Sequence, residues 1–430
     1  MIAALAAHMW RSPPDSRLPP IHSLNDCSMK LLLHDYGAYP FSRELAEILE
    51  GEYGVEVVYS FNGSLEGTPS GWAAGSGVTP TPITLPRPLR REKFVDRWRL
   101  ENLYGRKLAE LVRVERPDVA LFANTPVDAL VPAGRACHKL GISSVVWVQD
   151  LLGEAISQVL AEKFGGVAAP LAAWYRGREA SCLRRADHLI SISDAFAGYF
   201  DRHAIGRDDW TLIPNWAPLQ EIVPRAKQNP WSWRHEVSDK FTFMYSGTLG
   251  FKHRPELLVE LAEVFRADDG VRVVVNSSGA VAEWLRDEAR KRQLSHLVIN
   301  GFQPIEELPD VLASADVLIG MLAPDAATYC VPSKILSNHC AGRAQLLSIS
   351  EGNPAAKLVM EHRTGLVADP DDQASFLQAA RRLYSDTEER AAMARRARET
   401  AEAEFDIEII APRFLEVLNR VRPAPNTVPN

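Results

Sequence analysis

Residues 245–252, YSGTLGFK, are the stretch that decides the fold of this chain. They end the strand-like run 241–245 and hold two glycines, Gly247 and Gly250, in a turn. A helical pattern follows, with apolar residues at Leu257, Leu258, Leu261, Ala262 and Phe265. A strand, a glycine turn and a helix in this order bring backbone N–H groups close to a phosphate, and Lys252 adds a positive charge. The stretch therefore favours a two-domain enzyme that binds a phosphorylated ligand, although glycines also end strands for steric reasons.

The composition limits the class of protein. The chain has 430 residues, enough for two domains, and 46% of them are apolar, as in a soluble globular protein. A net charge of −7 argues against a nucleic-acid partner. The five cysteines are odd in number and form no Cys-x-x-Cys pair, which predicts a reduced, cytoplasmic protein without a disulfide framework or a zinc site. No apolar run reaches the roughly 18 residues of a membrane-spanning helix.

Strand-like and helical patterns alternate along two halves of the chain, which predicts an α/β fold with two Rossmann-like, doubly wound domains. The expected strands are 30–34, 55–60, 118–123, 144–148, 188–193 and 211–213, then 241–245, 271–276, 296–299, 316–321, 344–348 and 365–368. In the first half we expect helices at 43–50, 100–114 and 171–185. We place the domains at 29–222 and 223–404, followed by an amphipathic helix at 405–421.

The ends of the chain differ from the rest. Residues 1–28 are proline-rich and polar after a short apolar start, and they fit either a disordered extension or an upstream start codon that is not used. The tail 422–430 has three prolines and is expected to be disordered.

Two internal segments interrupt the strand–helix alternation. Residues 63–82 are rich in Gly, Ser, Thr and Pro, which predicts a long loop that is either functional or a mere insertion. Residues 87–107 carry eight Lys or Arg against three acids, with aromatic residues between them. This segment fits either a peripheral contact with an anionic membrane, on its inner face, or a solvated helix whose apolar stripe packs on the domain.

Five segments occur in an order and spacing that resemble a known family. They are RRADHLISIS from residue 184, TLIPNWAP, YSGTLGFK, NGFQPIEELPDVLASADVLIG and VPSKILSNHCAGRAQLL. Together they are similar to the retaining GT-B glycosyltransferases of family 4. The bacterial subgroup that builds exopolysaccharide, capsule and O-antigen, including the colanic-acid and fucosamine transferase types, is the most similar. Its DL-x-PE turn resembles QDLLGE at residues 149–154, and the likeness extends from Met29 to near Val421.

The resemblance implies two domains that face a cleft, with the nucleotide-sugar on the second domain and the acceptor on the first. The final helix, 405–421, would cross back to the first domain. The family needs no metal and no cofactor besides the nucleotide-sugar, which agrees with the absence of a DxD-type motif here.

Several residues match the family's donor-binding positions. The backbone of Gly247 and Gly250 would face the diphosphate and Lys252 would neutralise it, with Arg254 as the fallback if the turn is shifted. Thr248 stands where the family usually has an arginine. The two glutamates of the family's Glu-x7-Glu motif are replaced by Tyr329 and Ser337, so the ribose must be held differently.

A second cation is expected where Pro332, Ser333 and Lys334 open a helix. A phosphate there would meet free amides, a hydroxyl and an ammonium, and the alternative is an N-capping Ser333 beside an exposed Lys334. Phe302 and Gln303 match the segment that lies along the nucleobase, although Phe302 also fits a core position.

Four residues are candidates for the sugar or acceptor side. Gln149 takes the place of the family's usual histidine and would orient the sugar, while Asp150 would either accept a hydrogen bond from a substrate hydroxyl or cap the following helix. Tyr36 and Gly37 end the first strand, where the family has a glycine loop.

These matches predict a transferase that moves a sugar from a nucleotide-sugar, UDP- rather than GDP-linked, to a glycan or polyprenyl-diphosphate-linked acceptor of a bacterial surface polysaccharide. Asp150, Lys252 and Lys334 are the expected catalytic residues, in a retaining, metal-independent reaction. The alternatives are a GT-B nucleotide-sugar epimerase and a non-catalytic, nucleotide-sugar-binding subunit of an assembly complex.

Overall fold

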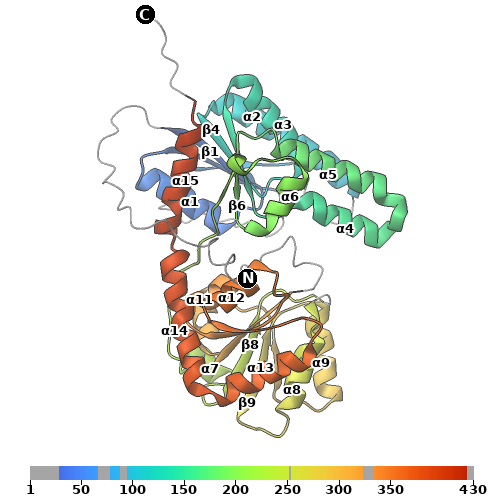
Figure 1. Cartoon of the computed structure of the whole chain (residues 1–430), viewed down its shortest axis with the longest axis vertical. Helices are drawn as coiled ribbons and strands as arrows, with labels where there is room; N and C mark the ends of the chain where they lie inside the picture. The colour runs from blue at the N-terminus through green and yellow to red at the C-terminus, as the bar shows by residue number, and fades with distance from the viewer. Residues whose placement is uncertain (1–28, 66–77, 88–93, 251–252, 323–333, 424–430) are drawn as a thin grey trace, which may run out of the picture.

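The computed structural model of the chain describes residues 29–65, 78–87, 94–250, 253–322 and 334–423. Two α/β domains follow each other along the long axis of the molecule, and the chain returns to the first domain at its end (Figure 1). The predicted fold class, two Rossmann-like domains with parallel sheets, is confirmed.

The first domain has a parallel sheet of seven strands among the described residues, in the order β3-β2-β1-β4-β5-β6-β7. They are β1 (Lys30–Asp35), β2 (Glu56–Asn62), β3 (Pro80–Ile83), β4 (Val119–Ala123), β5 (Ser143–Val148), β6 (His188–Ser191) and β7 (Trp210–Leu212). Its helices are α1 (Pro40–Gly51), α2 (Phe94–Glu115), α3 (Val127–Leu140), α4 (Leu152–Phe164), α5 (Ala169–Leu183) and α6 (Ala197–Arg202). β4, VALFA, is buried at every position, as expected for a strand covered by helices on both faces.

The second domain repeats the plan with a six-stranded parallel sheet in the order β10-β9-β8-β11-β12-β13. Its described strands are β8 (Phe241–Ser246), β9 (Val271–Asn276), β10 (Leu297–Asn300), β11 (Val317–Met321), β12 (Ala344–Ser348) and β13 (Gly365–Ala368). Its helices are α7 (Pro230–Arg234), α8 (Glu256–Val264), α9 (Ala280–Lys291), α10 (Leu308–Ala313), α11 (Lys334–Cys340), α12 (Pro354–Glu361), α13 (Gln373–Ser385) and α14 (Thr387–Glu404).

Four elements depart from the predictions in the first domain. α3 was not expected, and it holds Pro132 in its interior, a residue that normally argues against a helix. α4 and the short α6 were not expected either. β3 forms within the predicted loop 63–82, at its end, and its two prolines are tolerated because β3 is the edge strand of the sheet.

The last helix, α15 (Ile407–Val421), closes the first domain. In Figure 1, α14 runs beside the second domain and α15 continues in the same direction beside the first. Phe414 of α15 is fully buried and meets Trp147 of β5 edge-on, with ring centroids 4.7 Å apart. The same helix is held at its end by an ion pair between Arg422 and Asp118. The predicted crossover helix is therefore present and contributes to the core of the first domain.

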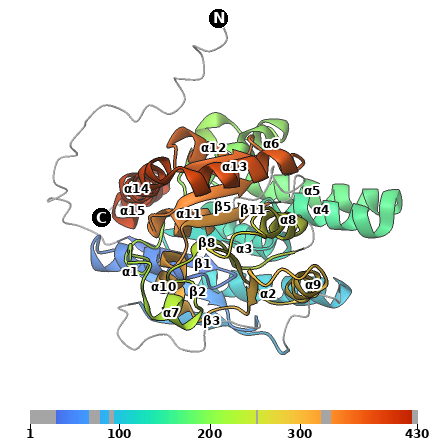
Figure 2. The ribbon, with the colours of Figure 1, turned by 90° about the horizontal axis from the view of Figure 1, so that it is seen from below.

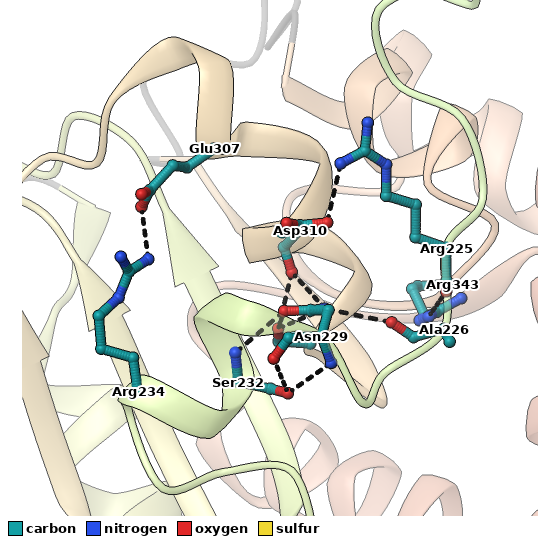
Figure 3. A network of polar contacts seen from close by, with 9 residues as sticks. Arg225, Ala226, Asn229, Ser232, Arg234, Glu307, Asp310 and Arg343 are labelled. Carbon is teal, nitrogen blue, oxygen red and sulfur yellow. Dashed lines mark hydrogen bonds and ion pairs between the residues drawn. The ribbon is translucent and has the colours of Figure 1, made fainter.

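The segment between the domains is fastened to the second domain by a polar network (Figure 3). Asn229 caps α7, accepting from the backbone N–H of Ser232 at 3.0 Å. Its side-chain amide donates to the carbonyl oxygens of Ala226 and Asp310, both at 3.1 Å. An ion pair joins Arg225 to Asp310 at 2.8 Å. The two contacts with Asp310 of α10 fix residues 225–234 to the second domain.

We expect Phe414→Ala to lower the free energy of unfolding by about 3–5 kcal/mol, because it leaves a cavity beneath β5. Ile409→Ala, on the exposed side of the same helix, should change it by less than about 0.5 kcal/mol. Urea unfolding followed by intrinsic fluorescence measures both. Equal losses for the two variants would contradict a core role for α15.

Candidate active site

The glycine turn lies at the point of the second sheet where the strand order reverses. β8 has β9 on one side and β11 on the other, so the connections leave it in opposite directions and open a crevice at the carboxyl ends of the strands. Gly247 follows β8 directly and has a φ of 130°, which strongly favours glycine. An added Cβ there would lie 3.4 Å from Nζ of Lys334. The turn therefore brings a backbone without side chains close to a cation, although the N–H groups of Gly247 and Gly250 already donate to the carbonyl oxygen of Asn276 at 2.9 Å and to Nδ1 of His253 at 3.0 Å.

Lys334 begins α11, as the sequence predicts, and its ammonium group lies against this turn. The Nζ atom contacts the phenolic oxygen of Tyr245 and donates to the carbonyl oxygen of Thr248 at 3.5 Å. The Tyr245 hydroxyl in turn donates to the same carbonyl oxygen at 2.6 Å. Burial raises the pKa of Tyr245 above its ordinary value of 10, so the phenol stays protonated beside the lysine. The result is a fixed positive charge beside the glycine turn.

The other residues predicted to bind the donor do not all lie at the glycine turn. Ser337 is half-buried one turn after Lys334, so the two lie on the same face of α11. Arg254 directs its guanidinium to the carbonyl oxygen of Pro370 and the carboxylate of Asp371, and it is therefore not turned toward the glycine turn. Lys252, Pro332, Ser333 and Tyr329 lie outside the described residues.

Phe302 and Gln303 follow β10 at the same edge of the sheet. Phe302 is 56% exposed, so the alternative of a core position is wrong. The Gln303 side chain is engaged on both sides, accepting from the indole N–H of Trp231 at 2.8 Å and donating to the carbonyl oxygen of Gly301 at 2.9 Å. The exposed ring is thus the group of this pair that remains available to a flat ligand.

A cavity of about 980 Å³ opens in the first domain at the carboxyl ends of β1, β4 and β5. This is again the place where the strand order reverses, between β1 and β4. Tyr36, Gly37, Gln149 and Asp150 all line it. The four residues that the sequence assigns to the sugar or acceptor side therefore lie together.

Asp35, which the sequence analysis did not single out, shapes one wall of this cavity. It is fully buried at the end of β1, and its carboxylate accepts from the backbone N–H groups of Gly37 and Tyr39 at 3.0 and 2.7 Å. Asn124, after β4, donates to the same carboxylate at 3.2 Å. A Cβ on Gly37 would come within 2.2 Å of the Tyr39 ring, so a side chain at this position would displace that half-exposed ring.

Gln149 and Asp150 present two different polar groups to the cavity. The Gln149 side chain is buried, and its amide nitrogen has no hydrogen-bond partner among the described residues. Asp150 is exposed to solvent on the lining of the cavity, and the partial desolvation of its carboxyl there raises its pKa from 3.8 to about 6. No hydrogen bond from the described residues reaches its carboxylate, and α4 begins two residues later, so the helix-capping alternative is not observed. A buried donor without a partner and a carboxylate suit a ligand with hydroxyl groups.

Glu179 of α5 is a second carboxylate at this cavity, and the sequence analysis missed it. It accepts from the backbone N–H of Gly153 at 2.7 Å and from the hydroxyl of Tyr199 at 3.0 Å. A Cβ at Gly153 would lie 2.7 Å from the carboxylate, so this approach depends on glycine. Burial raises the pKa of Glu179 from 4.5 to about 7. Glu179 thereby holds the start of α4, and with it the turn that carries Asp150.

Two features of the described residues bear on metals and membranes. They contain no group of three or more His, Cys, Asp or Glu side chains arranged to hold a metal ion. None of their helices combines the length and apolarity that a bilayer crossing requires.

Known families match both domains. Residues 37–216 match the family described as "Glycosyl transferase 4-like domain", and residues 240–386 match "Glycosyl transferases group 1". The chain belongs to family 4 of the GT-B glycosyltransferases. The family expected from the sequence is thereby confirmed.

This glycosyltransferase is 25% identical over 276 residues to the Escherichia coli K12 protein named as a colanic acid biosynthesis glycosyl transferase, WcaI. That match covers 63% of the chain and 65% of the relative. Among solved structures, Anabaena Alr3699/HepE in complex with UDP has a TM-score of 0.68 at 15% identity, over 91% of this chain and all of that one. Sucrose-phosphate synthase of Thermosynechococcus elongatus has a TM-score of 0.69 at 16% identity, over 91% and 98%. These structures share the fold.

The raised pKa of Glu179 predicts a pH-dependent stability. The folded state favours the protonated carboxyl of Glu179. Its contribution to the free energy of unfolding is therefore present at low pH and is lost as the pH rises from about 4.5 to about 7. Glutamine at this position cannot ionise. The free energy of unfolding of the Glu179→Gln variant, relative to that of the native chain, should therefore increase by about 2–3 kcal/mol between pH 5 and pH 8. Urea unfolding of both proteins at the two pH values measures this change. A difference that stays constant with pH would show that the carboxyl titrates normally.

Proposed function

We propose that this glycosyltransferase moves a sugar from a nucleotide-sugar, with UDP as the favoured nucleotide, to a glycan or polyprenyl-diphosphate-linked acceptor of a surface polysaccharide. The observation that carries the proposal is the Lys334 ammonium held against the Gly247 turn at the strand-order reversal of the second domain. A diphosphate at this place would meet a turn without side-chain bulk and a fixed cation.

In the proposed reaction the second domain stabilises the leaving group. As the bond between the sugar and the diphosphate lengthens, negative charge grows on the phosphate oxygen, and Lys334 stabilises it. Tyr245 keeps the ammonium in place, which lowers the cost of orienting it in the transition state. The acceptor hydroxyl attacks from the face that the diphosphate leaves, and a phosphate oxygen takes its proton, so the anomeric configuration is retained without a protein nucleophile.

The first domain supplies the acceptor side in this scheme. Gln149 offers its unpartnered amide to the sugar, and Asp150 accepts a hydrogen bond from a substrate hydroxyl other than the attacking one. With a pKa of about 6, Asp150 is mostly ionised at neutral pH and accepts hydrogen bonds in that form. Glu179 acts only through the turn at Gly153, as a positioning residue.

Relatives support the choice of nucleotide and pathway. The Anabaena protein with the same fold is known in complexes with UDP and with UDP-glucose. The E. coli relative is named for colanic acid biosynthesis. A structure named as a UDP-N-acetylglucosamine 2-epimerase from Listeria monocytogenes also shares the fold, with a TM-score of 0.59, so epimerisation is the rival that an activity assay must separate.

We expect Tyr245→Phe to weaken UDP binding about three- to tenfold, because Lys334 loses the hydroxyl that holds it. Tyr384→Phe is the matched control, since its hydroxyl donates to Asp268, away from the glycine turn. Isothermal titration with UDP measures both variants. If the two lose affinity equally, or neither does, the role given to Tyr245 and Lys334 is wrong.

The decisive test of the proposed function is turnover of a panel of UDP-, GDP-, dTDP- and ADP-sugars with a polyprenyl-diphosphate-linked acceptor, without added metal. The proposal predicts release of one nucleoside diphosphate that depends on the acceptor, and a glycoside of the donor's anomeric configuration by NMR. Conversion of the donor to its 2-epimer without an acceptor would establish the epimerase instead. Binding of nucleotide without any product would favour the non-catalytic subunit.

A further inference from the structure

A helical hairpin projects from the first domain and carries a cluster of exposed apolar side chains. α4 and α5 pack side by side and extend away from the rest of the molecule in both views (Figures 1 and 2). They are joined by the short 3-10 turn Gly165–Ala168. Val167 in this turn is 91% exposed and Phe164 just before it is 62% exposed. Leu171 and Trp174 on α5 are 39% and 43% exposed. We call Phe164, Val167, Leu171 and Trp174 the hairpin tip.

The hairpin tip is not a random scatter of apolar residues. Leu171 and Trp174 are three residues apart on α5 and therefore lie on one face of the helix. Beside them a shallow cavity of about 360 Å³ opens between the helices, lined by Gly165, Gly166, Ala168, Ala169, Ala172, Ser157 and Arg176. Apart from one serine hydroxyl, Arg176 is the polar side chain of this lining. The cavity is thus an apolar recess with a single guanidinium.

A buried carboxylate fixes the base of this surface. Asp128 on α3 is 2% exposed and forms an ion pair with Arg178 at 3.1 Å, while Tyr175 donates to it at 3.3 Å. The Arg178 guanidinium lies over the Trp174 ring, 4.6 Å from its centroid. Trp98 of α2 also hydrogen-bonds to Asp128 and is 39% exposed. Two half-exposed tryptophans therefore flank one anchoring group.

The charges around the hairpin tip are of both signs, with a basic excess. Residues 164–178, FGGVAAPLAAWYRGR, contain Arg176 and Arg178 and no acidic residue, but Arg178 is paired with Asp128, and Glu162 and Lys163 precede the segment. On α2, which reaches Asp128 through Trp98, Arg99, Arg106 and Lys107 are exposed cations. These belong to the segment 87–107 that the sequence assigned either to a membrane contact or to a packed helix. Its Leu100 and Tyr104 are buried in the domain, so the packed-helix alternative holds for the apolar stripe, and the tip of α4–α5 provides the exposed apolar groups instead.

We propose that the hairpin tip docks on the surface of an anionic lipid bilayer. Phe164 and Val167 enter the boundary between headgroups and acyl chains, and the two tryptophans lie at headgroup level, where this side chain is favoured. Arg176 and the cations of α2 meet lipid phosphates. A projecting tip suits a bilayer. A second copy of the chain would have to offer a complementary hollow, and it would bring the same basic residues to the contact.

The contact would also place the proposed acceptor site. α5 runs from the hairpin tip to the 980 Å³ cavity, which its residues Glu179, Cys182 and Leu183 line. A chain held by the tip would present this cavity near the membrane surface, within reach of an acceptor that carries a lipid anchor. The docking itself does not depend on which sugar is transferred.

The test is vesicle flotation of the full chain in 150 mM salt, with vesicles of phosphatidylcholine alone or with 30% phosphatidylglycerol. The native chain should float with the anionic vesicles and less with the neutral ones. Replacing both Phe164 and Val167 by Asp should reduce the bound fraction about tenfold, because the apolar insertion is lost. Val114→Asp, at a valine that is 68% exposed at the far end of α2, is the control and should bind like the native chain.

Three results would overturn the proposal. One is that the Phe164/Val167 variant binds vesicles as well as the native chain, while replacing Arg99, Arg106 and Lys107 by Glu abolishes binding. That result would assign the contact to α2 alone. Another is absence of binding by the native chain. A third is a dimer in light scattering that the Phe164/Val167 variant dissociates while vesicles remain unbound. Turnover of a soluble acceptor by the same variant keeps these outcomes separate from a failure of the proposed function.

Discussion

The geometry of parallel sheets is the constraint on which the two candidate sites depend. All strands of such a sheet end on one edge, and a crevice opens where successive connections leave in opposite directions. In the second domain this happens at β8, where Gly247 and Lys334 meet; in the first it happens between β1 and β4, where the large cavity opens. Each domain thus offers one open edge where residues that directly follow buried strands meet, and Lys334 reaches this edge from the start of α11.

The two domains are also connected through their cores. α15 follows the second domain in the sequence but buries Phe414 against Trp147 of β5. Gln149 and Asp150 come two and three residues after Trp147, at the end of the same strand. Any movement of the second domain that displaced α15 would therefore act on the strand that presents the acceptor-side groups. Because α15 packs in the core of the first domain, that core includes the last helix of the described chain.

Local patterns explain which parts of the site could be read from the sequence. The turn at Gly247 and the start of α11 at Lys334 are each defined by neighbouring residues, and both were predicted at the right place. Tyr36, Gly37, Gln149 and Asp150 each follow a strand, so their meeting at one edge also follows from the strand order. α3 was missed because Pro132 interrupts its pattern. The direction of Arg254, toward Asp371, depends on a loop more than one hundred residues away and has no local signal.

Residues that act by holding others were the ones missed. Tyr245 reads as a buried strand residue, and only the structure brings its hydroxyl to Lys334, 89 positions later. From the sequence, Glu179 is one charged residue of a helix. The glycine at position 153, which leaves room for its carboxylate, is the sequence feature that points to their contact. Asp35 was overlooked for a similar reason, since a carboxylate at a strand end gives no sign of the amides that it binds. Such groups become recognisable only when the partners are placed in space.

The most direct test of the central claim is an experimental structure of the chain with a bound nucleoside diphosphate. The account predicts that the terminal phosphate lies between the backbone of the Gly247 turn and Nζ of Lys334, with the base toward the exposed Phe302 ring. A diphosphate bound elsewhere, with Lys334 still turned to Tyr245 and no phosphate oxygen within hydrogen-bonding distance, would contradict it.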